Sequence, residues 1–348
     1  MALLSCGGAK QEVARPASVE PPGQPRALRL GHFPNLTHAQ AVLGRATGEY
    51  SKATGVLIDW RQFNAGPSAV EAMFAGAIDA TYVGPNPAIN GFVKSRGESF
   101  VVLAGAASGG AALVVRGDAG IASEADFHGK VVATPQLGNT QDVAARLWFS
   151  ARGYTLAERG GDLTILPLAN PDQLLMMQKR QIHGAWTVEP WVSRLEQEAG
   201  GRILLEEKSL WSDGRYATAV LIVRRAFLRD NPGLVDKLLG AHVEVTRRLQ
   251  SREEGLGALL AGEIQRETAS ALPDRVVESA LARLDFTWEP MAGALQKAAD
   301  DAHNVGFLSE RPDLRGLFEL APLAGVLAAK GLPAITTAPR ELDVGSRP

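Results

Sequence analysis

Cysteine is nearly absent from this chain of 348 residues, in which Cys6 is the single example. A lone cysteine excludes an intramolecular disulfide and a thiolate metal cluster. Neither sign of charge is in large excess, since the formal net charge is −2. No basic run typical of nucleic-acid binding occurs either. Long apolar runs are missing too: the best candidate, Gly316 to Leu332, is interrupted by Glu319 and Lys330. These absences predict a soluble body with no nucleic-acid partner.

Motifs for catalysis and metal binding are equally scarce. No two histidines have metal-ligand spacing on a helix; they stand at positions 32, 38, 128, 183, 242 and 303. Gly129-Lys130 lacks the upstream glycine of a phosphate loop, and Ser108 lacks the glycine two positions before it that a nucleophile elbow requires. The sequence therefore predicts a protein that is not an enzyme and that holds neither a metal nor a cofactor.

What the sequence contains instead is a long alternation of β-type and helical segments. Ten runs predict strands, at residues 27–32, 56–63, 78–83, 100–104, 111–115, 130–134, 163–166, 183–186, 203–205 and 218–223. Helical segments are predicted at residues 36–53, 68–75, 87–93, 122–127, 140–151, 171–179 and 187–198, and throughout residues 232–331. Strands that alternate with helices predict an α/β fold with mainly parallel sheets flanked by helices.

Two apolar β runs, Ala111 to Val115 and Thr218 to Val223, divide the chain. About one small domain of βα units lies between them. If both runs cross between lobes, residues 27–116 and 218–340 form lobe I, residues 117–217 form lobe II, and two strands form the hinge. Residues 1–26 are then a leader and residues 341–348 a tail. The alternative, one continuous doubly wound sheet, requires more strands than the sequence offers after Val223.

Four phrases, in this order, resemble a known family. They are Trp60 to Met73 (WRQFNAGPSAVEAM), Ala77 to Gly84 (AIDATYVG), Phe127 to Ala133 (FHGKVVA) and His183 to Trp191 (HGAWTVEPW). Together they resemble the solute-binding proteins of nitrate, taurine and aliphatic sulfonate ABC importers, a family that also includes thiamine-precursor binders. The resemblance covers residues 28 to 230 and implies the type II periplasmic-binding-protein fold. It also implies a monomer that serves an ABC permease and its ATPase.

The N-terminal segment resembles a lipoprotein leader. Leu3-Leu4-Ser5-Cys6 is similar to the bacterial lipobox, whose cysteine becomes the lipidated N-terminus after cleavage, although the basic region and most of the apolar region before it are missing. The proline-rich stretch from Arg15 to Pro25 suits an extended tether. We therefore expect lipidation at Cys6 and a location in the periplasm or at the cell surface. The alternative is an incidental cysteine in a disordered leader.

Loops after the predicted strands supply the candidate ligand-binding residues, because open α/β sheets bind ligands beyond the carboxyl ends of their strands. Gly138-Asn139-Thr140 begins a helix, where free N–H groups attract an anion, and the resembling family places its ligand at this turn. The alternative is plain N-capping by Asn139 or Thr140. In lobe I, Gly84 would let the backbone approach the ligand and Asn86 would offer its amide, unless this proline-flanked turn is only structural.

Five further residues are weaker candidates. Asn35 follows the first strand, and Ser108 could donate its hydroxyl unless its glycine-rich turn is an ordinary one. Trp186 could pack an alkyl chain or donate its indole N–H to the ligand, with core packing as the alternative. Glu189 would repel an anion, so it either binds a ligand ammonium or holds loop N–H groups. Arg215 is expected in a solvated loop rather than beside an anion.

The expected function is a clamp that closes on its ligand about residues 116–118 and 216–219. The expected ligand is a small oxyanion, with sulfonates first, then taurine, then nitrate. One alternative is a neutral heteroaromatic such as a thiamine precursor, stacked on Trp186 and Tyr82. Another is a ligand-sensing module with the same fold. Sulfinate desulfinases and yeast-type pyrimidine synthases share this fold as enzymes, but they rely on core cysteines, and this chain has none after Cys6.

Overall fold

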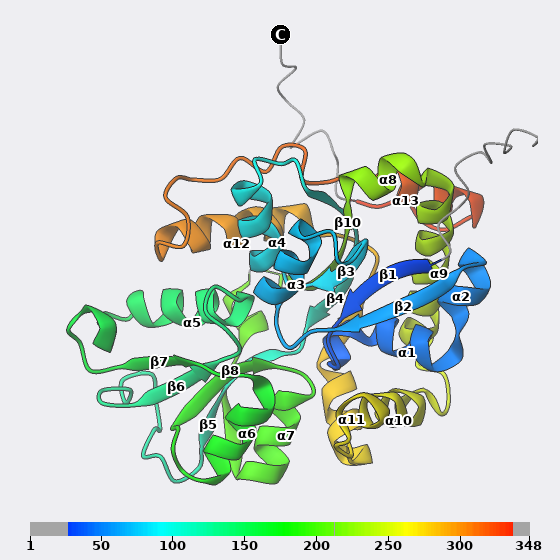
Figure 1. Cartoon of the computed structure of the whole chain (residues 1–348). Coiled ribbons are helices and arrows are strands. Elements are labelled where there is room, and N and C mark those ends of the chain that lie inside the picture. The colour runs from blue at the N-terminus through cyan, green and yellow to red at the C-terminus, as the bar shows by residue number, and fades with distance from the viewer. Residues whose placement is uncertain (1–26, 212, 337–348) are drawn as a thin grey trace, which may run out of the picture.

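The chain folds around two β-sheets, each flanked by helices (Figure 1). The structure is a computed structural model that describes residues 27–211 and 213–336. We call residues 27–109 and 217–336, which surround the six-stranded sheet, the first lobe. Residues 111–211 and 213–216, which surround the five-stranded sheet, are the second lobe. This architecture confirms the predicted α/β fold with two sheets; that the lobes move as units stays a prediction.

The first lobe is built on the sheet order β11-β4-β10-β3-β1-β2. Strand β1 pairs in parallel with β2 and β3, whereas β10 runs antiparallel to β3 and β4, and β11 runs antiparallel to β4. The sheet is therefore mixed rather than mainly parallel, because the returning strand β10 is inserted at its centre. The strand bounds are β1 Ala27–His32, β2 Leu57–Gln62, β3 Ala80–Val83, β4 Phe100–Gly109, β10 Ala217–Arg224 and β11 Leu284–Phe286.

The second lobe is built on the sheet order β7-β6-β8-β5-β9. Strand β6 pairs in parallel with β7 and β8, and β5 runs antiparallel to β8 and β9. This sheet is mixed for the same reason as the first: the strand that crosses between lobes, β5, runs against its neighbours. The bounds are β5 Ala111–Arg116, β6 Val131–Thr134, β7 Thr164–Pro167, β8 Gly184–Val188 and β9 Gly201–Glu206.

Strand alternation places helices on both faces of each sheet. On β10, Leu221 packs with the helices α1, α2 and α9–α11, while Val220 and Ile222 pack on the opposite face with α3, α4 and α12. On β5, Leu113 packs on the face covered by α5, and Val114 packs on the face covered by α6 and α7. Each sheet is thus the central layer of its lobe.

The helices have the following bounds in the first lobe: η1 Leu36–His38, α1 Ala39–Thr47, α2 Glu49–Thr54, α3 Gly66–Phe74, α4 Pro85–Lys94, α8 Arg225–Asp230, α9 Pro232–Ser251, α10 Leu256–Thr268, α11 Asp274–Ala282, α12 Ala292–Asn304 and α13 Ala321–Ala329. Those of the second lobe are α5 Thr140–Ser150, η2 Ala157–Arg159, α6 Asn170–Gln178, α7 Trp191–Ala199 and η3 Glu207–Leu210. The predicted helix over 36–53 is divided at Gly48, whose φ of 69° ends α1.

The chain crosses between the lobes at two adjacent places. The first crossing is at Gly109 and Gly110, whose φ angles of 78° and 72° favour glycine. The second is at Tyr216, whose backbone N–H donates to the Ser108 hydroxyl at 3.2 Å, and the Thr218 hydroxyl donates to the Gly109 carbonyl at 2.6 Å. Residues 111–116 therefore belong to the second sheet, not to lobe I as expected, and the first crossing precedes the expected residues 116–118.

Two local predictions are wrong. Residues 122–127 do not form a helix, because the Asp126 carboxylate accepts hydrogen bonds from the N–H groups of Ala122 and Ser123 and holds the segment as a turn. The region after Pro232 is not wholly helical, because β11 adds an edge strand to the first sheet beside β4. Over the described residues, no helix has the length and apolarity that crossing a bilayer requires.

Candidate ligand-binding site

A small cavity lies between the two lobes. Its volume is about 20 Å³, which is room for about one water molecule. Both lobes contribute to its walls, and the lining residues are Phe33, Asn35, Thr37, His38, Asn64, Gly84, Pro135, Asn139, Gln141, Asn170, Val188 and Thr218. The lobes are therefore close together in this structure, and any larger solute requires them to separate before it enters.

The cavity wall is formed where strands end and helices begin. Asn35 precedes η1, which leads directly into α1, and Gly84 is the N-cap of α4 after β3. Across the cavity, Asn139 is the N-cap of α5 after β6, with no side-chain capping bond. The first N–H groups of a helix have no acceptor within the helix and carry a partial positive charge, so the starts of η1 and α5 favour an anion. The start of α4 adds little, because Pro85 and Pro87 have no N–H and the Asn86 N–H faces Thr140 Oγ1.

No charged side chain lines the cavity. Burial lowers the pKa of His38 well below its ordinary value, with a smaller contribution from the charge of His32, so the imidazole is neutral near pH 7. Its Nδ1 accepts the N–H of Phe33 at 3.1 Å, which leaves the proton on Nε2. The lining therefore offers amide, hydroxyl and imidazole donors without a full countercharge.

The side-chain amide of Gln141, which lines the cavity, has an N–H donor without a hydrogen-bond partner in the described chain. Its side chain is 3% exposed, and its Nε2 has no hydrogen-bond partner among the described residues. A buried amide without a partner is unfavourable by about 1–3 kcal/mol. A ligand oxygen bound beside Gln141 would remove this penalty, so Gln141 favours a ligand that accepts a hydrogen bond.

Two hydrogen bonds join the lobes at the cavity. The Trp191 indole N–H in α7 donates to Asn35 Oδ1 at 2.9 Å, and the Asn86 backbone N–H lies 3.4 Å from Thr140 Oγ1. Gly84 lies against the same hydroxyl, because a Cβ built on it would be 2.6 Å from Thr140 Oγ1. Of the predicted residues, Asn35, Gly84 and Asn139 thus line the cavity, and Asn86 and Thr140 border it.

Four predicted residues lie elsewhere. Gly138 precedes the cavity wall and donates its N–H to the Asp142 carboxylate. The Ser108 hydroxyl accepts the backbone N–H of Tyr216, where the chain crosses between the lobes. Trp186 was expected to face the cleft but is fully buried in the core of the second lobe, where its indole N–H donates to Glu207 Oε2 at 2.8 Å. It lies two residues before the end of β8, and Val188 at that end lines the cavity instead.

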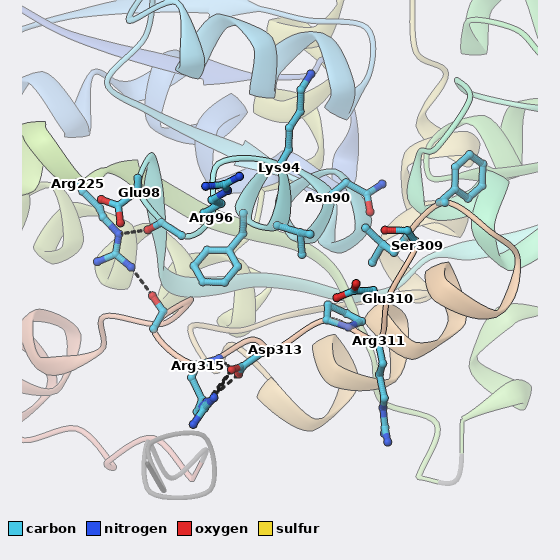
Figure 2. A pocket seen from close by; sticks show the side chains of 17 residues that line it. Asn90, Lys94, Arg96, Glu98, Arg225, Ser309, Glu310, Arg311, Asp313 and Arg315 are labelled. Atoms are coloured by element: carbon cyan, nitrogen blue, oxygen red, sulfur yellow. Dashed lines mark hydrogen bonds and ion pairs between the residues drawn. The ribbon is translucent and has the colours of Figure 1, made fainter. Parts of the chain in front are cut away.

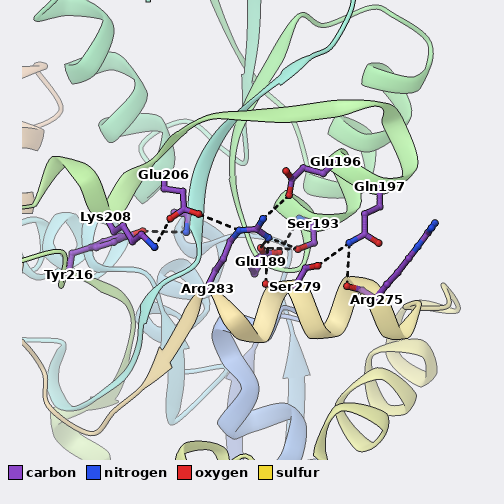
Figure 3. A network of polar contacts seen from close by, with 11 residues as sticks. Glu189, Ser193, Glu196, Gln197, Glu206, Lys208, Tyr216, Arg275, Ser279 and Arg283 are labelled. Atoms are coloured by element: carbon purple, nitrogen blue, oxygen red, sulfur yellow. Dashed lines mark hydrogen bonds and ion pairs between the residues drawn. The ribbon is translucent and has the colours of Figure 1, made fainter.

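Glu189 belongs to an ionic network beside the hinge (Figure 3). Its buried carboxylate accepts bonds from the N–H and hydroxyl of Ser193, and from the Arg283 guanidinium of the first lobe at 3.1 Å. Arg283 also pairs with Glu196 at 2.9 Å and with Glu206 at 3.5 Å. Burial raises the pKa of Glu189 to about 7 despite these bonds. Glu189 therefore joins the lobes through Arg283 and does not line the cavity.

The aromatic side chains expected for a heteroaromatic ligand are also engaged elsewhere. The Tyr82 hydroxyl lies 2.5 Å from the Tyr50 hydroxyl and 2.8 Å from His242 Nδ1, in the core of the first lobe. Phe33 is the one Phe, Tyr or Trp side chain in the lining. Arg215 is exposed, as expected for a solvated loop.

A much larger space, of about 1010 Å³, is a separate groove on the first lobe (Figure 2). It lies between the C-terminal half of α4 and residues 307–316, away from the interlobe cavity. Arg315 pairs with Asp313 there, and Arg225 donates to the carbonyls of Gly97 and Gly316. Arg225 and Arg315 are therefore engaged within this loop region, whereas the interlobe cavity is lined from both lobes, so the smaller cavity is the candidate site.

Sequence reasoning missed several lining residues: Phe33, Thr37, His38, Asn64, Pro135, Gln141, Asn170, Val188 and Thr218. A signal existed for two of them. Asn64 follows β2 and Asn170 follows β7, so both stand at the carboxyl ends of strands where ligands bind in open α/β sheets. The same rule that selected Asn35 would have found them.

Comparison with known proteins agrees with this architecture. The chain is 26% identical over 198 residues to the taurine-binding periplasmic protein of Escherichia coli (strain K12); the match spans 56% of this chain and 58% of that protein. The alkanesulfonate-binding protein SsuA from Xanthomonas axonopodis pv. citri superimposes with a TM-score of 0.71, at 21% identity, over 86% of this chain and all of that one. The nitrate-binding protein NrtA from Synechocystis PCC 6803 gives 0.77, at 15% identity, over 90% and 92% of the two chains.

The fold also occurs in an enzyme, since the desulfurization enzyme DSZB superimposes with a TM-score of 0.63 at 18% identity, over 88% of this chain and all of that one. At these identities the structural likeness shows the fold alone. The sequence profile of the NMT1-like family, however, matches residues 21–258, well over half of the chain. The chain belongs to the NMT1-like family.

Proposed function

We propose that this protein is the extracytoplasmic solute-binding component of an ABC importer and that it captures a small anionic solute by closing its two lobes. The observation that carries the proposal is the interlobe cavity, where the starts of η1 and α5 and neutral side-chain donors from both lobes converge without a charged side chain. Fixed N–H dipoles hold an oxyanion without a full countercharge. The solute is a sulfonate first, with taurine and nitrate as the other candidates.

The partners follow from the same proposal. A permease and ATPase receive the closed, liganded form of a monomeric binding protein that works in the periplasm. Lipid anchoring through Cys6 belongs to this proposal as well, although Cys6 lies outside the described residues. The sensor alternative would keep the clamp without a transporter, and a neighbouring permease and ATPase gene pair separates the two. The heteroaromatic alternative has less support, since Trp186 and Tyr82 lie in the cores.

The proposal is tested by thermal unfolding of the full chain with methanesulfonate, butanesulfonate, taurine, nitrate and a pyrimidine thiamine precursor. A ligand at about a hundred times its dissociation constant stabilises the folded state by about 2.7 kcal/mol. We expect a rise in Tm with at least one anion. Gln141→Leu should abolish that rise because it removes the free donor, whereas Gln181→Leu, an exposed site on the same lobe, should retain it.

Two results would contradict the proposal. A rise with the pyrimidine alone would replace the anion by a neutral ligand while keeping the clamp. A rise that is equal in Gln141→Leu and in the wild-type protein would place the binding site away from the interlobe cavity.

A further inference from the structure

The ionic network around Glu189 lies directly beside the first crossing between the lobes. The Glu189 backbone N–H donates to the Gly110 carbonyl at 2.8 Å. On the other side of the crossing, Leu284 pairs with Gly109 in the first sheet, and a Cβ built on Gly109 would lie 2.6 Å from the Arg283 carbonyl oxygen. Arg283 of the first lobe and Glu189 of the second lobe therefore flank the two glycines at which the chain changes lobe.

The Arg283 guanidinium is bound on three sides by carboxylates of the second lobe (Figure 3). Its Nη1 lies 3.1 Å from Glu189, its Nη2 2.9 Å from Glu196 and its Nε 3.5 Å from Glu206. These carboxylates come from three elements, since Glu189 directly follows β8 and the others lie in α7 and β9. We call Arg283 and the three carboxylates the hinge cluster. A planar guanidinium with all three nitrogens engaged has one orientation, so a rotation of the lobes must break part of the cluster.

The second lobe contributes an excess of negative charge to the hinge cluster. The Glu189 side chain is fully buried, and those of Glu196 and Glu206 are partly exposed. Lys208 of the same lobe pairs with Glu206 at 2.6 Å, and among the described residues Arg283 is the one cation that the first lobe pairs with these carboxylates. Without Arg283, three neighbouring carboxylates would share a single ammonium group and would repel one another. Contact with the first lobe therefore stabilises this charged part of the second lobe.

Polar contacts continue from the hinge cluster along α7 and α11. Gln197 Nε2 donates to the Arg275 carbonyl and to the Ser279 hydroxyl, each at 3.2 Å, and Arg194 Nη1 donates to Ser270 Oγ at 3.3 Å. The buried apolar residues of α7 and of α11 pack into separate cores, one in each lobe. Separation of these two helices therefore exposes polar groups that water can hydrate, and the hinge cluster is the charged part of a contact suited to reversible opening.

We propose that Arg283 is a positioning residue that holds the two lobes at the closed angle and thereby sets how long a bound solute is retained. This inference rests on the proposed function for the movement of the lobes, but not on the identity of the solute. Arg283 does not line the interlobe cavity, so it acts on the solute through the angle between the lobes. Because a solute in that cavity leaves only when the lobes separate, loss of the hinge cluster should speed release and leave entry into the open form unchanged.

Single-molecule FRET on the full chain tests the angle directly. In a Cys6→Ser background, the dyes are attached at Lys179→Cys and Lys237→Cys, two exposed sites on different lobes. Arg283→Met should lower the closed fraction measured without solute by about tenfold, because truncation of one partner of a buried charge pair has at least that effect. Arg283→Lys keeps the charge but loses the three-sided contact, so it should restore only part of the closed fraction. The matched control Arg275→Met, an exposed position in α11, should behave like the wild-type protein.

Stopped-flow binding with methanesulfonate, butanesulfonate, taurine and nitrate as probes measures the effect on the solute. Arg283→Met should raise the dissociation rate constant by about tenfold and change the association rate constant by less than about twofold. Glu196→Gln removes one partly exposed carboxylate and is expected to fold normally. It should also speed dissociation, but it should have no further effect in the Arg283→Met background, because both substitutions act on the same contact.

Two results would overturn the inference while leaving anion capture intact. One is an unchanged closed fraction and dissociation rate constant in Arg283→Met. The other is an equal effect of Glu196→Gln with and without Arg283, which would show that the carboxylate acts independently of the guanidinium. The absence of binding by every probe would instead overturn the proposed function, and the closed fractions measured without solute would still decide the role of Arg283.

Discussion

Replacing Gly84 by alanine should obstruct closure of the lobes without disturbing the first lobe itself. Gly84 has φ −68° and ψ 157°, an extended conformation that alanine adopts without strain. The added Cβ would lie 2.6 Å from Thr140 Oγ1, which belongs to the opposite lobe. Its nearest neighbour within the first lobe, the Thr218 carbonyl oxygen, would be 3.7 Å away, an ordinary contact. The clash therefore exists only in the closed state.

The size of the effect follows from the overlap. An ordinary Cβ contact begins near 3.4 Å, so the two lobes or the Thr140 side chain must give way by about 0.8 Å. Overpacking by one methyl group costs about 1–3 kcal/mol. Rotation of the Thr140 side chain would relieve part of it at the expense of the 3.4 Å contact with the Asn86 N–H, a weak bond. We expect about 1–2 kcal/mol, which lowers the affinity for an anion by about 5- to 30-fold.

Calorimetric titration with butanesulfonate measures this change, and small-angle scattering follows closure in the same samples. Thr140→Ala removes the hydroxyl and leaves its Cβ 3.6 Å from the new methyl, so the double variant should recover most of the lost affinity. Gly240→Ala, in α9 with no atom within 4 Å of the new Cβ, is the matched control and should bind like the wild-type protein. Wild-type affinity in Gly84→Ala, or a double variant no better than the single one, would refute the reasoning.

Two further predictions concern buried carboxylates. Burial raises the pKa of Glu189 from 4.5 to about 7. The folded state is therefore favoured by about 3 kcal/mol below pH 4.5, where Glu189 is protonated in both the folded and the unfolded chain. This contribution to the free energy of unfolding is lost as the pH rises through 7. Glu189→Gln should therefore gain stability relative to the wild-type protein between pH 5 and pH 8 in urea unfolding, and a pH-independent difference would contradict this. The Asp79 carboxylate is buried but accepts hydrogen bonds from Arg29 and Arg224, which hold its pKa below the ordinary value. Its contribution to the free energy of unfolding is therefore present at neutral pH and is lost as the pH falls below about 4. Asp79→Asn should lower the free energy of unfolding at pH 7 by about 2–3 kcal/mol. The control Asp59→Asn removes a largely exposed ion pair and should change the free energy of unfolding by less than about 1 kcal/mol. Equal effects of the two substitutions would show that burial does not matter here.

Sequence periodicity predicts the strands well because most of them bury apolar side chains, and β5 and β10 do so on both faces. All ten predicted strands are present, with ends that differ by about two residues or fewer except in β4, which continues from the predicted end at Ala104 to Gly109. The missed strand, β11, has only three residues, and Leu284 and Phe286 flank one aspartate in a helical region. Its pairing depends on the position of β4, which no local pattern encodes. The helix predicted over 122–127 failed because a single side chain, Asp126, supplied a competing set of bonds.

The lobe boundary shows a different limit of sequence reasoning. The runs 100–104 and 111–115 are both apolar, so hydrophobicity alone could not indicate which strand crosses between sheets. The φ angles of Gly109 and Gly110 mark the crossing in the structure. The pair of adjacent glycines was the available signal, because two such residues permit a change of direction between extended segments.

Site residues were predictable where the strand-end rule applies directly, as for Asn35, Gly84 and Asn139. Trp186 was mispredicted because its position, two residues before the end of β8, places it under α5 rather than at the edge of the sheet. Gln141 could not be predicted, since its place in the cavity wall depends on how α5 is rotated relative to the opposite lobe. Whether such a residue lines the cavity depends on how the two lobes contact one another.

On the proposed function, this dependence on contact between lobes accounts for how a neutral cavity would bind an anion. The start of η1 belongs to the first lobe and the start of α5 to the second, so their first N–H groups come to the same cavity only where the lobes are in contact. In the proposed open state each set would face water, where the dielectric constant is high and a dipole attracts an anion weakly. The proposed closure would exclude water and strengthen the same interactions, so ligand binding and closure would be coupled. A change at the lobe contact, such as the methyl group of Gly84→Ala, should therefore alter anion affinity as much as the removal of a donor does.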